Sequence, residues 1–333
     1  MQLPDAFDIF FDRISLGKKQ VDRIESATNA LIDFLSKAYD IPAENIFRQG
    51  SYENGTAVKP ADSDNGEYDV DVVCVFASAA MSADAALDDL EAKFAGDGNY
   101  AQHLRRDESR KNPCVRLFYA DDEIGSFHVD VVPARESQSG DPQAPLEVPR
   151  RGAGWHDTAP QEYTRWCKDE GDRFARTVMM LKRWREEHQE ARKSIKSIVL
   201  QVLAATNLGM QGSDGEALAS TLSTMQAALS SSPEEAPRVE NPVLRNENLA
   251  ARWTKSDYQD FRKELVEAVD LASRALAASD TKVSHELWRE LLGDDFPPPD
   301  PGATQQKTRV MPTTPAPGYQ QTQAPPTRDR YGS

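Results

Sequence analysis

Apolar residues near the start of the chain recur every three, four or seven positions, which is the spacing of one face of a helix. The recurring positions are Phe7, Phe10, Phe11, Ile14, Val21, Ile24, Thr28, Leu31 and Leu35. This pattern predicts one long helix over residues 5–38, with Gly17 as a weak point inside it. The segment 38–45 then breaks the pattern. We therefore expect a long N-terminal spine helix within residues 1–40.

Short runs of β-branched and aromatic residues follow, and such runs are typical of strands. They cover 45–51, 68–76, 113–120 and 126–134. Between the second and third runs, the pattern predicts helices over 83–95 and 99–108. The Pro- and Gly-rich stretch 137–154 carries no strong element signal. Residues 41–155 are therefore predicted to form a mixed α/β domain.

Helical spacing dominates the rest of the folded part. The predicted helices cover 160–188, 194–209, 214–230, 256–278 and 281–292. Gly209 and Gly293 stand where helix C-caps are expected. The chain thus divides into the helix 1–40, an α/β domain 41–155 and a helical domain 156–295, which is an α+β organisation.

Composition sets the last segment apart and limits the partners of the rest. Residues 296–333 hold nine of the 21 prolines and almost no large aliphatic residues, so they are predicted to form a disordered tail. The formal charge of the chain is −15; the tail contributes +2, which leaves −17 for the body. So acidic a body is a poor candidate for sequence-independent binding of duplex DNA.

The cysteines and the chain start point to a reducing compartment. Cys74, Cys114 and Cys167 stand singly and form no CxxC or Cys/His cluster. The first residues are acidic and amphipathic, unlike a signal peptide, and no run approaches the ~18 apolar residues of a membrane span. We expect a cytoplasmic protein with no membrane partner.

Two aspartates interrupt the predicted strand "YDVDVVCVF". Because residues two apart on a strand point the same way, Asp69 and Asp71 project side by side from one face. The opposite face carries Val70, Val72 and Cys74 and can pack in a core. Two adjacent carboxylates repel each other unless a divalent cation lies between them, and Mg²⁺ prefers carboxylate and water oxygens.

Two further features complete the pattern. Asp130 lies in another β-branched run, "FHVDVV", and three carboxylates on adjacent strands can hold two Mg²⁺ ions. Upstream, Gly50 and Ser51 end a predicted strand where a helix can begin. A glycine there lets the backbone approach a phosphate, and a serine hydroxyl with helix N-terminal amides can bind the anion.

A Gly-Ser pair, then Asp-x-Asp, then a distant single Asp, each in strand context, resembles the DNA polymerase β-like nucleotidyltransferase superfamily. The segments "GSYENGTAVKP", "YDVDVV", "HVDVVPA" and "RTVMMLKRWREEH…SIKSIVLQVL" are similar to those of the bacterial cGAS/DncV-like nucleotidyltransferases (CD-NTases). The resemblance covers residues 5–293. It implies a bilobed fold: a polymerase β-like catalytic core with a mixed sheet, a helical OAS/poly(A)-polymerase-like domain, and a central cleft between them.

The resemblance also implies the roles of individual residues. Asp69, Asp71 and Asp130 correspond to the catalytic metal ligands, which bind two Mg²⁺ ions that Mn²⁺ can replace. Gly50 and Ser51 correspond to the phosphate-binding turn. A lysine and a serine of the helical domain hold the triphosphate across the cleft in this family, and here they are Lys182 and Ser197. From its position alone, Arg48 either reaches a phosphate or pairs with a surface acid.

The activity implied is synthesis of a cyclic di- or trinucleotide from NTPs, ATP among them, with release of pyrophosphate. The biological setting implied is CBASS antiphage signalling, with an accessory protein that acts on the C-terminal tail or regulates activity. Direct sensing of duplex DNA is not expected of this acidic chain.

Three rival interpretations can be weighed at this point. A structural or interaction protein would leave the three strand aspartates unexplained. A linear oligoadenylate-like synthase or another nucleotidyltransferase of the same fold would share these motifs. The sequence gives no information on the bases used, the linkage or the ring size. A non-catalytic module on the same fold typically lacks one or more metal ligands, and all three are present here.

Overall fold

The computed structural model describes residues 1–61, 68–105, 113–119, 126–139, 141, 143–210 and 212–299. Residues 1–299 form one compact unit. The predicted start of the tail at residue 296 is wrong, because Phe296 is fully buried in the helical core. The tail from residue 300 onward lies outside the described residues, as do the predicted helix ends beyond Arg105.

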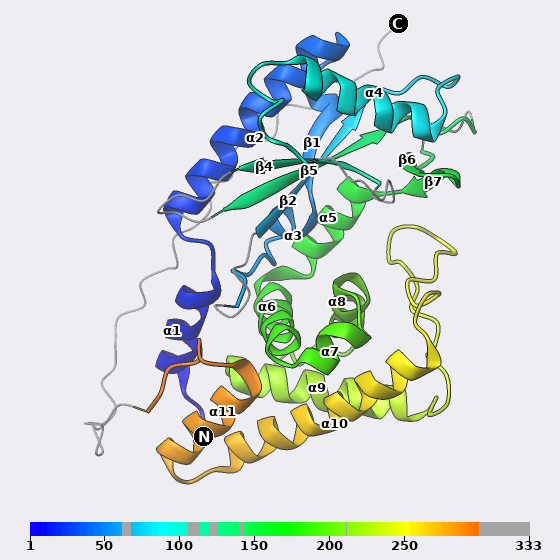
Figure 1. Ribbon diagram of the computed structural model, residues 1–333. Coiled ribbons are helices and arrows are strands. Elements are labelled where there is room, and N and C mark those ends of the chain that lie inside the picture. The colour runs from blue at the N-terminus through cyan, green and yellow to red at the C-terminus, as the bar shows by residue number, and fades with distance from the viewer. Residues whose placement is uncertain are drawn as a thin grey trace, which may run out of the picture. The chain divides into compact units, whose positions relative to one another are not determined.

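A five-stranded mixed sheet forms the first half of the unit (Figure 1). Its strand order is β1-β2-β5-β4-β3, in which β2 and β5 are parallel and the other neighbours antiparallel. The strands are β1 (Ile46–Gln49), β2 (Tyr68–Val75), β3 (Leu104–Arg105), β4 (Val115–Tyr119) and β5 (Phe127–Ala134). Four of them confirm the predicted runs, and the mixed sheet with its helices confirms the α+β class.

Two helices, α2 (Lys18–Tyr39) and α4 (Ala83–Gly96), cover one face of this sheet (Figure 1). Phe34 of α2 stacks on Phe94 of α4 with ring centroids 5.8 Å apart. Val70 and Val72 of β2 are fully buried in the same core. The opposite face of β2 is therefore left for Asp69 and Asp71.

The second half of the unit is helical. It contains α1 (Pro4–Ile14), α5 (Pro160–Asp169), α6 (Gly171–Glu187), α7 (Gln189–Ser194), α8 (Ser197–Thr206), α9 (Asp214–Ser230), α10 (Lys255–Ala277) and α11 (Thr281–Leu292). Figure 1 shows α5 and α6 running from beside the sheet into this helical group. The helices share a core separate from that of the sheet.

The prediction of one helix over 5–38 is wrong. The chain leaves helical geometry at Ser15, and a new helix begins after Gly17, whose amide donates to the Gln20 side chain at 2.8 Å. The periodic stripe is continuous across the break because both helices bury an apolar face, but they bury it in different cores: α1 in the helical core and α2 against the sheet.

Four other element predictions need correction. Residues 99–103 form turns and Leu104–Arg105 a short strand, not a helix. The stretch 137–154 contains β6 (Leu146–Arg150), which pairs with β7 (Gly154–Thr158). The predicted helices 160–188 and 194–209 are each interrupted, at Glu170–Gly171 and before Ser197.

The two glycines differ in their outcome. Gly293 ends α11 with φ +79°, as expected of a C-cap. Gly209 does not cap α8, which ends at Thr206. An added Cβ at Gly209 would lie 2.7 Å from the Ala217 carbonyl oxygen, so this glycine permits close packing on α9.

A 3₁₀ turn (Ala43–Asn45) directly precedes β1, and a short helix, α3 (Gly50–Glu53), directly follows β1. In the described part of the chain, no helix has the length and apolar character needed to cross a membrane.

Candidate active site

The carboxylates of β2 and β5 lie side by side. The parallel register pairs Asp71 with Asp130 and Asp69 with His128. Asp69 is exposed and Asp71 half-buried, whereas Val70 and Val72 are buried. The predicted projection of Asp69 and Asp71 from one face is therefore confirmed, and the register places Asp130 on the adjacent strand.

Asp130 has a partner that the sequence pattern did not suggest. Arg116 on β4 lies opposite Asp130. Its Nε donates to Asp130 Oδ1 at 2.8 Å, and its Nη2 donates to Oδ2 at 2.8 Å. The thiol of Cys114 also hydrogen-bonds this carboxylate. Burial raises the pKa of the Cys114 thiol to about 12. In the sequence, "CVR" and "HVD" each place a charged residue two positions after Cys114 or His128, but only the register of β4 with β5 shows that Arg116 pairs with Asp130.

The three carboxylates create a charge conflict at Asp71. Burial, followed by the charges of Asp130 and Asp69, raises the pKa of Asp71 to about 7. Arg116 and Lys182 act in the opposite direction. A divalent cation beside Asp69 and Asp71 would remove this conflict, because it stabilises their ionised forms.

The donor set of Asp69 and Asp71 fits the predicted Mg²⁺, which prefers oxygen ligands. Among the described residues, no three Asp, Glu, His or Cys side chains are arranged to hold a metal ion. Asp130 is instead held in a bidentate ion pair by Arg116. Each carboxylate oxygen keeps a lone pair beyond the one that accepts from Arg116, so the ion pair does not by itself prevent Asp130 from binding an ion.

Gly50 brings the backbone against the carboxylates. Its φ is +76°, in the left-handed region that favours glycine. A Cβ added there would lie 2.1 Å from Asp71 Oδ2, so any side chain would displace the carboxylate. The ladder between β1 and β2 ends at the pair Gln49–Asp71, and Ser51 follows in α3, where it lines the same cavities as Asp69.

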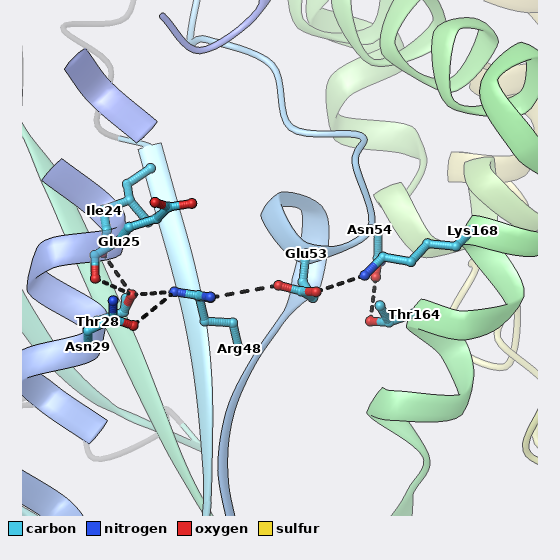
Figure 2. A network of polar contacts seen from close by, with 9 residues as sticks. All are labelled: Ile24, Glu25, Thr28, Asn29, Arg48, Glu53, Asn54, Thr164 and Lys168. Carbon is cyan, nitrogen blue, oxygen red and sulfur yellow. Dashed lines mark hydrogen bonds and ion pairs between the residues drawn. The ribbon is translucent and has the colours of Figure 1, made fainter. Parts of the chain in front are cut away.

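A polar network holds the helix that carries Ser51 (Figure 2). Glu53 lies between two cations, with Oε1 2.8 Å from Lys168 Nζ of α5 and Oε2 3.7 Å from Arg48 Nε of β1. Beside it, Thr164 donates to Asn54 Oδ1 at 2.7 Å. The turn is thus attached both to the sheet and to α5.

Arg48 completes this network from the other side. Its Nη1 donates to Thr28 Oγ1 of α2 at 3.0 Å, and Thr28 in turn donates to the Ile24 carbonyl oxygen at 2.8 Å. Of the two readings of Arg48, pairing with an acid is the one that the structure shows.

Lys182 and Ser197 approach from the helical half. Lys182 is buried in α6 and donates to the Thr56 carbonyl oxygen at 2.9 Å. Burial, and after it the charge of Arg185, lowers the pKa of Lys182 to about 8. Ser197 is the first residue of α8, and its Oγ accepts a hydrogen bond from Arg185 Nη1 at 2.5 Å.

Two cavities meet at these side chains. The first has a volume of about 640 Å³ and the second of about 460 Å³. Both are lined by Ser51, Asp69, Lys182 and Ser197, and the second also by Gly50 and Asp71. Six of the seven predicted site residues therefore converge on one cleft. Asp130 lines neither cavity and reaches the site through its register with Asp71.

Each cavity has a distinct chemical character. Beyond the shared residues, the first is lined by Lys59, Arg185 and Arg192, with Glu186 among them. The second takes polar groups from the helical half, including Tyr163, Gln201 and Asn241. None of these was singled out from the sequence, because each meets the motif residues only through the fold.

A Gly-Ser turn beside paired carboxylates on a mixed sheet, joined to a helical half, is the arrangement expected of a nucleotidyltransferase of the polymerase β-like fold. Residues 1–170 match the family model described as the Second Messenger Oligonucleotide or Dinucleotide Synthetase domain, and the chain belongs to this family. It is a bacterial CD-NTase, a nucleotidyltransferase of the cyclic oligonucleotide synthase class.

Individual relatives agree with this assignment. The chain is 26% identical over 291 residues to a cyclic AMP-AMP-AMP synthase of an Acinetobacter species, covering 83% of this chain and 80% of the relative. Among solved structures, the Bradyrhizobium diazoefficiens CD-NTase CdnG with GTP has a TM-score of 0.70 at 16% identity, over 89% of this chain and 96% of that one.

A second solved structure is that of E. coli MS115-1 CdnC with ATP, with a TM-score of 0.68 at 17% identity, over 88% of this chain and 98% of that one. The same CdnC is also known in a complex with HORMA-deltaN. At these identities the structural matches support the fold alone.

Proposed function

We propose that this chain is a Mg²⁺-dependent synthase that makes a cyclic di- or trinucleotide from NTPs, ATP among them, with release of pyrophosphate, in CBASS antiphage defence. One observation carries the proposal: two cavities share Ser51, Asp69, Lys182 and Ser197. A reaction that joins two nucleotides needs a donor-binding site and an acceptor-binding site that meet at the reacting phosphate.

The first cavity suits the donor triphosphate. Ser51 and Ser197 offer hydroxyls, and Lys182 offers the N–H groups of its ammonium that Thr56 does not use. Asp69, Asp71 and Asp130 are the proposed ligands of two ions. When bound there, Mg²⁺ supplies charge neutralisation for the attacking hydroxyl and for the leaving pyrophosphate.

The second cavity suits the acceptor nucleotide. Its ribose hydroxyl would attack the α-phosphate of the donor at the shared wall, where Asp69 and Ser51 lie. The chain's contribution is positioning, because phosphoryl transfer asks little covalent chemistry of the protein. A repeated transfer and a final intramolecular one would close the ring.

The test is a product assay with purified protein, Mg²⁺ and α-labelled NTPs, supplied singly and together. The products are treated with phosphatase and separated. We expect a phosphatase-resistant product that is absent from the Asp69→Ala/Asp71→Ala variant. Asp260→Ala/Glu267→Ala removes two exposed acids of α10 and should leave the product unchanged.

The outcomes separate the candidate functions. A phosphatase-sensitive oligomer would show that the enzyme makes a linear product and not a cyclic one. Absence of both product and Mg²⁺-dependent NTP binding would overturn the proposal. NTP binding that requires Asp69 and Asp71, without product, would instead indicate an enzyme that needs an activating partner.

An accessory protein forms the second part of the proposal. The HORMA complex known for CdnC supports regulation by a protein partner in this family, and the Pro-rich segment 296–333 offers a second point of action. Assays of the full chain and of a chain ending at Pro299, each with the candidate partner, would distinguish regulation at the body from action on the tail.

A further inference from the structure

A carboxylate lies among the cations of the first cavity. Glu186 of α6 accepts a hydrogen bond from Arg185 Nη2, and its Oε2 lies 3.0 Å from Arg192 Nε. All three side chains line the cavity together with Lys182 and Ser197. The Glu186 side chain is only 16% exposed, so its charge is not simply solvated at the surface.

This carboxylate uses the donors that a phosphate would need. Guanidinium groups bind carboxylates and phosphates through the same charge-assisted, often bidentate hydrogen bonds. Glu186 also acts on Lys182, whose pKa its charge raises while burial and Arg185 lower it. It therefore interacts with three of the cations that line the cavity, Lys182, Arg185 and Arg192.

We propose that Glu186 is an internal competitor of the substrate: in the nucleotide-free protein it holds Arg185 and Arg192, and the donor triphosphate displaces it. This inference deepens the proposed function and rests on it for the identity of the ligand. Arg185 and Arg192 then become triphosphate-binding residues. No bond is made or broken in this exchange, which replaces one anion by another.

The contacts of Arg185 are suited to such an exchange. Its Nη1 donates to Ser197 Oγ at 2.5 Å, which leaves the Ser197 hydroxyl proton free to point at a phosphate oxygen. Its Nε is buried and makes no hydrogen bond within the described residues. A buried donor without an acceptor is costly, so the present contacts do not satisfy all the donors of Arg185.

The exchange has consequences for selectivity and turnover. A ligand must carry enough charge to displace Glu186, which favours a triphosphate over shorter chains. When pyrophosphate is the product, the carboxylate can return to the arginines and promote its release.

The experiment measures binding of inorganic triphosphate by titration calorimetry in EDTA, without metal or turnover. We expect Glu186→Gln to bind inorganic triphosphate about tenfold more tightly than the parent, because the amide no longer holds the guanidinium groups as strongly. The matched control is Glu187→Gln. It is the next residue, it also pairs with an arginine, Arg183 at 3.6 Å, and it does not line the cavity.

A double-mutant cycle tests whether the competition is for the arginine itself. In an Arg192→Gln background, the gain from Glu186→Gln should shrink to about threefold or less. Glu186→Asp keeps the charge but shortens the side chain, and we expect an intermediate gain.

Three results would overturn the inference: unchanged or weaker binding in Glu186→Gln, an equal gain in Glu187→Gln, which would indicate a general charge effect, or a gain independent of Arg192. Failure of the proposed function has a different appearance. Triphosphate would still bind as described in EDTA, while the product assay with Mg²⁺ and NTPs would yield neither product nor Mg²⁺-dependent NTP binding.

Discussion

Asp71 is a carboxyl group placed where its charged form is disfavoured. Its pKa in the folded chain is raised to about 7 from 3.8, mainly by burial and then by Asp130 and Asp69. Because the folded state holds the proton more tightly than the unfolded state, this group contributes most stability below about pH 4. The contribution is lost as the pH rises to about 7.

This leads to a prediction for the metal-free protein. In EDTA, Asp71→Asn should raise the free energy of unfolding relative to the parent by an amount that grows from about pH 4 to about pH 7 and is constant above, reaching a few kcal/mol. Thermal or urea unfolding across this range measures it. A difference independent of pH would show that Asp71 is not protonated near neutrality.

At this scale, the sequence revealed residues whose role depends on their immediate neighbours in the chain. The alternation of "YDVDVV" was enough to place Asp69 and Asp71 on one face, and Gly50 with Ser51 at a strand end. Arg116 and Glu186 were missed because their meaning arises from contacts across the fold. Arg116 acts through strand register, and Glu186 through two arginines in a cavity.

At the scale of elements, α3 is too short to hold its own position and depends on the Glu53 network of Figure 2. Glu53→Gln should raise the KM for the donor NTP about twofold to fivefold, the size expected of a partly exposed ion pair, with kcat little changed. The reason is that Ser51 shares this turn. Steady-state rates at varied NTP concentration provide the measurement.

The control for this variant is an equally short ion pair whose two residues line neither cavity. Glu234 lies 2.8 Å from Lys255, and Glu234→Gln should leave the KM unchanged. If Glu53→Gln instead lowered the stability and left the KM as in the parent, the network would be structural only.

Most elements were predictable because their period is local. Strands β2 and β5 and helices α9 and α11 match their predicted ranges closely. The break at residues 15–17 was not predicted, because an unbroken apolar stripe does not reveal that its two halves face different cores. The β6–β7 pair was missed because its turn-rich sequence becomes a ribbon only through pairing between its own strands.

At the scale of the whole unit, the two ends of the described chain pack together in the helical core. Phe296 is fully buried and meets Phe7 of α1 edge-to-face with ring centroids 5.1 Å apart. Phe296→Ala should lower the free energy of unfolding by about 3–5 kcal/mol, through lost contacts and the cavity left behind.

Chemical denaturation measures this loss, and Val283→Ala is the control. Val283 lies on α11 but is 45% exposed, so its truncation should change stability by about 0.5 kcal/mol or less. Equal effects of the two substitutions would contradict an anchoring role for Phe296.

The cationic lining of the first cavity stands within a chain of net charge −15. A nucleotide, itself a polyanion, is therefore repelled at long range and attracted only near its seat. Salt screens the distant repulsion first, because the Debye length is about 10 Å at 0.1 M. Moderate ionic strength should then speed the encounter between nucleotide and enzyme. It should also weaken the ion pairs between the bound nucleotide and the cavity, so association and dissociation rates would both rise.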